Sequence, residues 1–211
     1  MERARDVFSR RLLLMNCFIS SSISYSGYSY STSFEAGRGG DDVKVFIGGA
    51  RGIKHFNDEV KSKLHAIAKR EVEVLLGDAS GVDYAVQDFF KKIGYKKIVI
   101  YASGGKVRNN IGDWEVVSIT VDENVYGYEF YKQKDIAMAN DSDYGFMIWN
   151  GKSRGTLNNM VNLTKQKKTC MVYLEPKNKI FTLEKDTDLQ ALLLECPENT
   201  NKNYNKLIVQ D

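Results

Sequence analysis

Residues 43–51 read VKVFIGGAR, an apolar run of strand length that ends in two glycines and an arginine. Two later stretches have the same form. Residues 72–76 are apolar and precede GDASGVD at 77–83, and residues 144–148 are apolar and precede WNGKSRGT at 149–156. In an open α/β sheet, ligands bind at the carboxyl ends of the strands, where such loops lie. The pattern therefore predicts an α/β fold with polar, glycine-rich loops at one edge of the sheet.

Helices are predicted between these strands. Asn57 is a good helix N-cap, and apolar residues follow it at helical spacing. Further strands are expected at 97–101, 116–121, 169–174 and 179–183, and helices at 82–93, 126–140, 157–163 and 189–194. Alternating strands and helices predict a Rossmann-like three-layer α/β/α sandwich with a mainly parallel sheet of about five to six strands.

The 211 residues are expected to form one main domain at 43–176, with a C-terminal extension at 177–211 that contains a helix. Residues 1–42 differ in composition, since an arginine-rich start and an apolar run precede a Ser/Tyr/Gly-rich stretch. We interpret them as a disordered leader, with organellar targeting as the alternative. Their apolar run is too short to span a membrane. A cytoplasmic protein is therefore expected.

Composition excludes several function classes. The net charge is only +3 and the cations alternate with acids, which argues against nucleic acid as a partner. Three cysteines without metal-ligand spacing argue against a disulfide framework and a metal site. No GxGxxG motif is present, so no dinucleotide cofactor is expected. Composition does not decide whether the protein forms a homo-oligomer.

The loop GGAR at 48–51 has exposed backbone N–H groups and an arginine, which suit a phosphate. In GDASGVD, two roles coexist. Ser80 and Asp83 have the spacing of a helix capping box, and the same loop can hold phosphate or ribose. SRGT at 153–156 opens a helix, where N–H groups, hydroxyls and cations favour an anion.

Other residues are expected near the same pocket. Arg108, Asn109 and Trp114 lie on a long polar loop that suits a lid, with core packing as the alternative for Trp114. Asp135, on the predicted helix at 126–140, either faces the pocket or is a surface carboxylate. The expected ligand-binding residues are Gly48, Gly49, Ala50, Arg51, Gly77, Ala79, Ser80, Gly81, Arg108, Asn109, Trp149, Gly151, Lys152, Ser153, Arg154, Gly155 and Thr156.

Together these segments resemble the SLOG superfamily, a group of Rossmann-like domains that includes LOG-type phosphoribohydrolases and DNA-processing protein A. The resemblance covers roughly residues 43–174 and is strongest for the YspA/YpsA-related branch. It implies a nucleotide-derived ligand at the carboxyl end of the sheet. It also implies that the LOG glutamate, which serves cleavage of an N-glycosidic bond, is replaced here by Asn159.

Three functions follow as hypotheses. The first is binding of a nucleotide-derived small molecule, such as ADP-ribose or a nucleoside monophosphate, as a signal sensor. The alternative is a nucleoside or nucleotide N-glycosidase or transferase in which Asp78, Asp83 or Asp135 replaces the missing carboxylate. The third is binding of single-stranded nucleic acid, against which the weak net charge argues.

Overall fold

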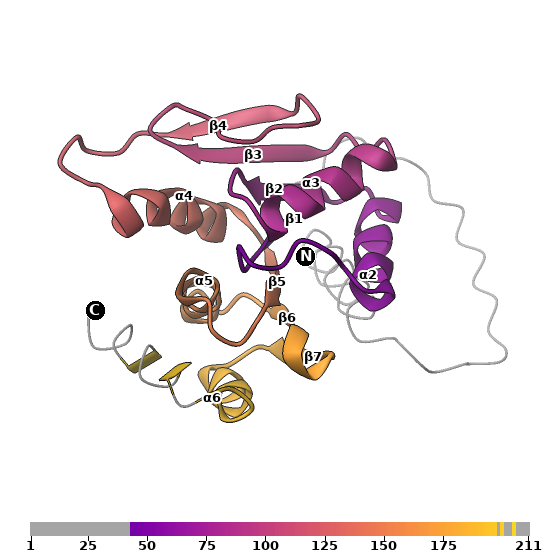
Figure 1. Ribbon diagram of the computed structural model, residues 1–211, viewed down its shortest axis with the longest axis vertical. Helices are drawn as coiled ribbons and strands as arrows, with labels where there is room; N and C mark the ends of the chain where they lie inside the picture. Colours follow the sequence, from indigo (N-terminus) through magenta and orange to yellow (C-terminus); the bar gives the residue numbers. More distant parts are fainter. Residues whose placement is uncertain (1–42, 198, 201–203, 206–211) are drawn as a thin grey trace, which may run out of the picture.

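The computed structural model describes residues 43–197, 199–200 and 204–205. Its centre is a seven-stranded sheet in the order β4-β3-β2-β1-β5-β6-β7 (Figure 1). All neighbouring strands are parallel except β6 and β7, which are antiparallel. The strands are β1 (Lys44–Gly49), β2 (Glu73–Gly77), β3 (Ile98–Ser103), β4 (Glu115–Ile119), β5 (Tyr144–Trp149), β6 (Cys170–Leu174) and β7 (Lys179–Leu183). The mainly parallel sheet is confirmed, with more strands than expected.

Helices cover both faces of the sheet and complete the predicted three layers (Figure 1). One face packs against α2 (Asp58–Lys69) and α3 (Val82–Lys92). The other packs against α4 (Gly127–Asp141), α5 (Arg154–Lys165) and α6 (Asp186–Leu194). A short 3-10 helix, η1 (Glu175–Lys177), joins β6 to β7.

The two central strands, β1 and β5, decide where a ligand can bind. Both are almost wholly buried, because helices cover both sides of their apolar runs. From β1 the chain builds β2, β3 and β4 on one side and then returns to place β5 on the other side. In doubly wound sheets, the crevice beyond such a change of direction is the usual ligand site.

The predicted cap of α2 is present. The side chain of Asn57 accepts a hydrogen bond from the backbone N–H of Val60 at 3.0 Å. The same side chain donates to the hydroxyl of Tyr173 at 3.0 Å. The first turn of α2 is therefore attached to the end of β6.

The start of α3 corrects one expectation. Gly81 rather than Ser80 is the N-cap residue, and no side chain caps the helix there. A Cβ at Gly81 would overlap the backbone of Arg51, and its φ of 81° favours glycine. Asp83 does reach back, but it accepts from the N–H of Ala79 at 3.2 Å. The loops after β1 and β2 are thus held in direct contact.

For Trp114 the structure confirms the alternative of core packing, and the residue is not part of a lid. The residue is 8% exposed and packs in the cluster beneath α2 and α3. Its Nε1 donates to the carbonyl of Tyr95 at 3.1 Å. The side chain of Asn110 bonds both the N–H and the carbonyl of Trp114.

The C-terminal part continues the same layers. β7 extends the sheet beyond β6, and α6 packs on α5 and β7. The expected leader at 1–42 and the end of the tail lie outside the described residues. Among the helices that the structure describes, none has the length and apolarity needed to cross a membrane.

Candidate functional site

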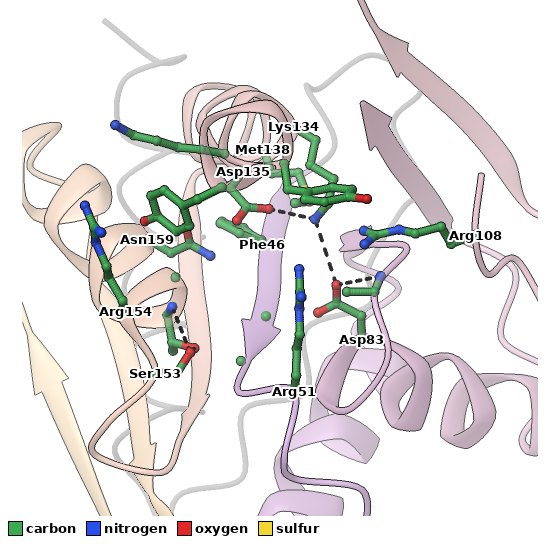
Figure 2. Close-up of a pocket in the computed structure, with 18 of the residues that line it drawn as sticks. Phe46, Arg51, Asp83, Arg108, Lys134, Asp135, Met138, Ser153, Arg154 and Asn159 are labelled. Carbon is green, nitrogen blue, oxygen red and sulfur yellow. Dashed lines mark hydrogen bonds and ion pairs between the residues drawn. The ribbon is translucent and has the colours of Figure 1, made fainter. Parts of the chain in front are cut away.

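A cavity of about 510 Å³ lies at the carboxyl ends of the central strands. Its walls come from β1, the loops after β2 and β3, the inner face of α4 and the start of α5 (Figure 2). All four polar segments singled out in the sequence therefore contribute to one cavity. The expected residues that line it are Gly48, Gly49, Arg51, Ala79, Asp83, Arg108, Asp135, Ser153, Arg154, Gly155 and Thr156.

Positive charge dominates this cavity. Five cations line it, against the two carboxylates of Asp83 and Asp135. In Figure 2, Arg154 lies on one wall, and Arg51 and Arg108 lie on the opposite wall. Charges on facing walls of low-dielectric protein reinforce one another in the space between. The cavity is therefore suited to an anionic ligand.

The first turn of α5 forms one wall. The hydroxyl of Ser153 caps the helix, and it accepts from the N–H of Thr156 at 3.4 Å and from its hydroxyl at 3.0 Å. The N–H groups of Arg154 and Gly155 have no partner within the helix, because they belong to its first turn. Together with the helix dipole they favour a phosphate or carboxylate at this position.

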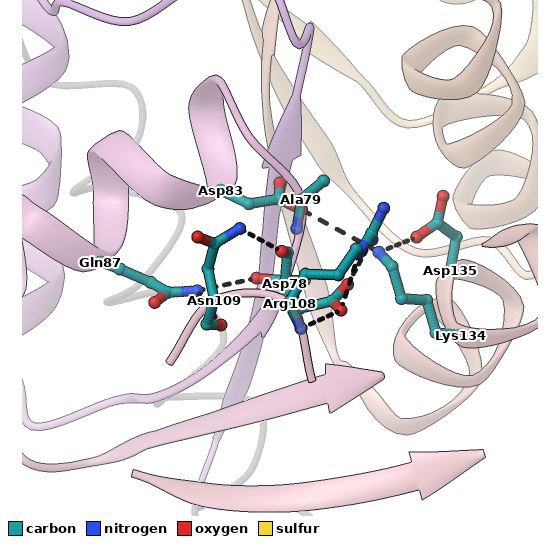
Figure 3. A network of polar contacts seen from close by, with 9 residues as sticks. Asp78, Ala79, Asp83, Gln87, Arg108, Asn109, Lys134 and Asp135 are labelled. Carbon is teal, nitrogen blue, oxygen red and sulfur yellow. Dashed lines mark hydrogen bonds and ion pairs between the residues drawn. The ribbon is translucent and has the colours of Figure 1, made fainter. Parts of the chain in front are cut away.

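Asp78 and Arg108 form a buried ion pair beside the cavity (Figure 3). Asp78 is 2% exposed and accepts hydrogen bonds from the Nε of Arg108 at 3.0 Å and from its N–H at 3.1 Å. Burial alone would raise the pKa of Asp78, but these bonds from Arg108 hold it below its ordinary value. The carboxylate is thus ionised and fully engaged, and it does not line the cavity.

A second buried group, Lys134, joins α4 to the first turn of α3. Its ammonium lies 2.7 Å from Asp135 and 3.9 Å from Asp83 (Figure 3). Burial alone would lower its pKa, but the carboxylates of Asp135 and Asp83 raise it, so the ammonium stays charged. Burial raises the pKa of Asp83 to about 6, although Lys134 acts in the opposite direction. Asp83 therefore changes its charge near neutral pH.

Two tyrosines of α4 stack with the arginines. The guanidinium of Arg108 lies 4.3 Å from the ring centroid of Tyr131, and that of Arg154 lies 4.7 Å from the ring centroid of Tyr128. Arg51 is also within reach of Tyr131, at 5.7 Å. Such cation–π contacts hold the guanidinium groups at the cavity. A ring adds no negative charge, so of these three arginines Arg108, which is also paired with Asp78, has the most compensated charge.

The remaining expected residues support the walls from behind. Gly77 leaves room for Asp83 and Lys134, which a Cβ would overlap. The side chain of Asn109 donates to the carbonyl of Asp78 at 2.8 Å. Ala50, Ser80 and Gly81 belong to the two loops that pack together and do not line the cavity.

Trp149 also lies outside the cavity. It is fully buried, and its Nε1 donates to the carbonyl of Ser153 at 3.0 Å, which positions the start of α5. Gly151 and Lys152 line a different cavity of about 560 Å³, next to η1 and the end of α6. These three residues were expected to contact the ligand, but they do not line the first cavity and instead belong to the segment that leads into α5.

On the inner face of α4, the sequence predicted only Asp135 as a site residue. Tyr128, Tyr131 and Met138 line the cavity together with the expected Asp135, and Lys134 lies beside them. Positions 128, 131, 135 and 138 share one helical face, a spacing visible in the sequence. Because no apolar stripe marks α4, hydrophobic periodicity does not predict which face of this helix is turned inward. Among the described residues, no cluster of His, Cys, Asp or Glu has the arrangement of a metal site.

The fold is similar to that of DNA processing protein A from Helicobacter pylori, with a TM-score of 0.51 and 16% identity over 80% of this chain and 81% of that one. That structure describes a unique single-stranded DNA binding mode of the Helicobacter protein. The sequence matches no protein-family model and no curated protein. The Rossmann-like architecture implied by the resemblance is thus confirmed, and both the SLOG superfamily and its YspA-like branch stay predictions.

Proposed function

We propose that this protein binds a nucleotide or nucleotide-derived small molecule, with a phosphate at the start of α5. One observation carries this proposal: the first turn of α5 and three arginines from separate segments lie around a single cavity. A phosphate accepts hydrogen bonds from helix N–H groups and from guanidinium groups at the same time. The cavity volume falls within the range of small-molecule sites.

Sensing rather than catalysis is the role that we propose for this binding. Asp78 is fully occupied by Arg108, and an amide, Asn159, stands on α5 where the resemblance implies a glutamate. An amide has no full charge with which to stabilise a developing cation. The protein would therefore leave its bound ligand intact, and the bound fraction would follow the concentration of the ligand.

Titration calorimetry with AMP, ADP-ribose, NAD and cyclic nucleotides tests this function. We expect saturable heat from at least one of these ligands, with one molecule bound per chain. The absence of saturable heat from every ligand at millimolar concentration would contradict the proposal.

An N-glycosidase remains a second candidate because of Asp83. Its carboxyl faces the cavity, and its pKa of about 6 suits a general acid at neutral pH. Asp135 would then supply the stabilising negative charge. Release of free base from nucleoside monophosphates, lost in both Asp83→Asn and Asp135→Asn, would favour the enzyme over the sensor.

Binding should depend on pH through Asp83. Because the folded-state pKa of Asp83 is raised to about 6, lowering the pH from 7.5 to 5 protonates its carboxyl and removes a negative charge from the cavity wall. We expect ADP-ribose, whose diphosphate stays ionised over this range, to bind about five-fold more tightly at pH 5. Asp83→Asn should bind equally at both pH values, and a variant that keeps the full dependence would exclude Asp83 as its source.

Nucleic acid is not part of this proposal. The three arginines of the site lie around one cavity, and Trp114 is in the core and unable to stack on a base. The single-stranded DNA binding described for the Helicobacter pylori protein is a property of that relative.

A further inference from the structure

We propose that Asn159 and Tyr128 form an uncharged subsite next to the anion site, and that this subsite takes a hydroxyl group of the ligand's sugar. The inference rests on the proposed function and specifies which part of the ligand, other than its phosphate, is recognised. Both side chains line the cavity, one from α5 and the other from α4.

The first observation concerns Asn159. This residue is only 5% exposed, and its Oδ1 is buried without a hydrogen-bond partner among the described residues. Leaving a buried acceptor unpaired destabilises the folded protein, and native structures contain few such groups. A buried polar group without a partner in the wall of a cavity indicates that the partner belongs to the ligand.

The second observation concerns Tyr128. Its hydroxyl is also buried and has no partner among the described residues. Burial raises the pKa of this hydroxyl, so it stays protonated and can donate a hydrogen bond at neutral pH. The guanidinium of Arg154 covers the ring at 4.7 Å and fixes the position of the side chain.

A hydroxyl matches this pair better than other ligand groups. It donates and accepts, so it pairs with the carboxamide of Asn159 in either orientation of that amide and with the phenol of Tyr128. A second phosphate or carboxylate would meet the Oδ1 of Asn159 and the carboxylate of Asp135, which also lines the cavity. A carbonyl would leave Oδ1 without a donor.

The position along α5 also fits a sugar. Asn159 is four residues beyond Gly155, so it lies on the same helical face about one turn, ~5.4 Å, further along the helix. In a sugar 5-phosphate, a single methylene group separates the phosphate from the ring. A phosphate at Gly155 therefore brings the sugar hydroxyls close to Asn159.

Calorimetry of matched variants tests this subsite. The variants are Asn159→Leu and Tyr128→Phe, and the control is Asn162→Leu, because Asn162 is on the same helix, does not line the cavity and also has a buried, unpaired Nδ2. The probes are AMP, its 2′-deoxy and 3′-deoxy analogues, IMP, ribose 5-phosphate and inorganic phosphate.

We expect the wild-type protein to prefer AMP over one deoxy analogue by about ten-fold, the worth of one hydrogen bond. Asn159→Leu should lower the affinity for AMP to that of this analogue and leave the affinities for the analogue and for inorganic phosphate unchanged. Tyr128→Phe should act in the same direction, and Asn162→Leu should bind like the wild type. Without ligand, the melting temperature of Asn159→Leu should be unchanged or higher, because the substitution removes an unpaired polar atom.

Three outcomes would overturn the inference alone. The first is that the wild-type protein binds AMP and both deoxy analogues with equal affinity. The second is that Asn159→Leu loses affinity equally for all probes. The third is that Asn159→Leu loses a preference of the wild type for AMP over IMP, which would place the amino group of the base at the subsite. Tighter binding of ribose 5-phosphate than of inorganic phosphate, lost in Asn159→Leu, would assign the hydroxyl to the sugar. If no probe binds at all, the proposed function fails together with the inference.

Discussion

Gly155→Glu is expected to lower the affinity for phosphate-bearing ligands by about a hundred-fold or more. The substitution places a carboxylate at the first turn of α5, where the ligand phosphate is proposed to lie. Like charges brought together in this way cost several kcal/mol, and a hundred-fold loss corresponds to about 2.7 kcal/mol. Calorimetric titration with the tightest ligand of the panel measures the effect.

The fold should survive this substitution. A Cβ at Gly155 would meet no heavy atom within 4 Å, and an acidic residue in the first turn suits the helix dipole. Gly52→Glu is the matched control, because Gly52 is equally open but does not line the cavity. Equal affinity in the Gly155→Glu and Gly52→Glu proteins would show that the anion binds elsewhere.

Lys134→Met is expected to cost about 3–5 kcal/mol of the free energy of unfolding, the usual penalty for removing one partner of a buried ion pair. The side chain of Lys134 is 5% exposed and its ammonium lies between two carboxylates. Without it, the buried Asp83 has no cation opposite it on α4. Urea denaturation at pH 7.5 measures the loss.

Two further variants separate this effect from a general loss of packing. Lys132→Met removes a neighbouring lysine whose partner, Glu129, is largely exposed, so it should change stability by no more than about 0.5 kcal/mol. Adding Asp83→Asn to Lys134→Met should recover part of the loss, because the more deeply buried of the two carboxylates that Lys134 faces is then uncharged. Equal stability of the Lys134→Met and Lys132→Met proteins would show that the ion pairs of Lys134 with Asp83 and Asp135 do not stabilise the fold.

Patterns that act locally were predictable from the sequence. Apolar runs of strand length became buried strands, and Asn57 caps α2 because its side chain needs only a neighbouring N–H. The common position of the loops also followed, since parallel strands bring their carboxyl ends to the same edge.

Features that depend on contacts between distant segments were not predictable. Gly81 caps α3 in place of Ser80 because the backbone of Arg51 lies against it. Trp149 was expected to contact the ligand, but its indole N–H donates a hydrogen bond to the carbonyl of Ser153 before α5. Lys134 of α4 was not predicted as part of the site, because its contact with Asp83 joins segments some fifty residues apart in sequence.

The central claim is that the start of α5 and the surrounding arginines hold a phosphate. Native mass spectrometry after incubation with AMP, ADP-ribose and NAD tests it most directly, with Gly155→Glu and Gly52→Glu measured in parallel. We predict an adduct of one phosphate-bearing ligand per chain in the wild-type and Gly52→Glu proteins, and none in Gly155→Glu. The absence of any adduct, or the same adduct in all three proteins, would contradict the claim.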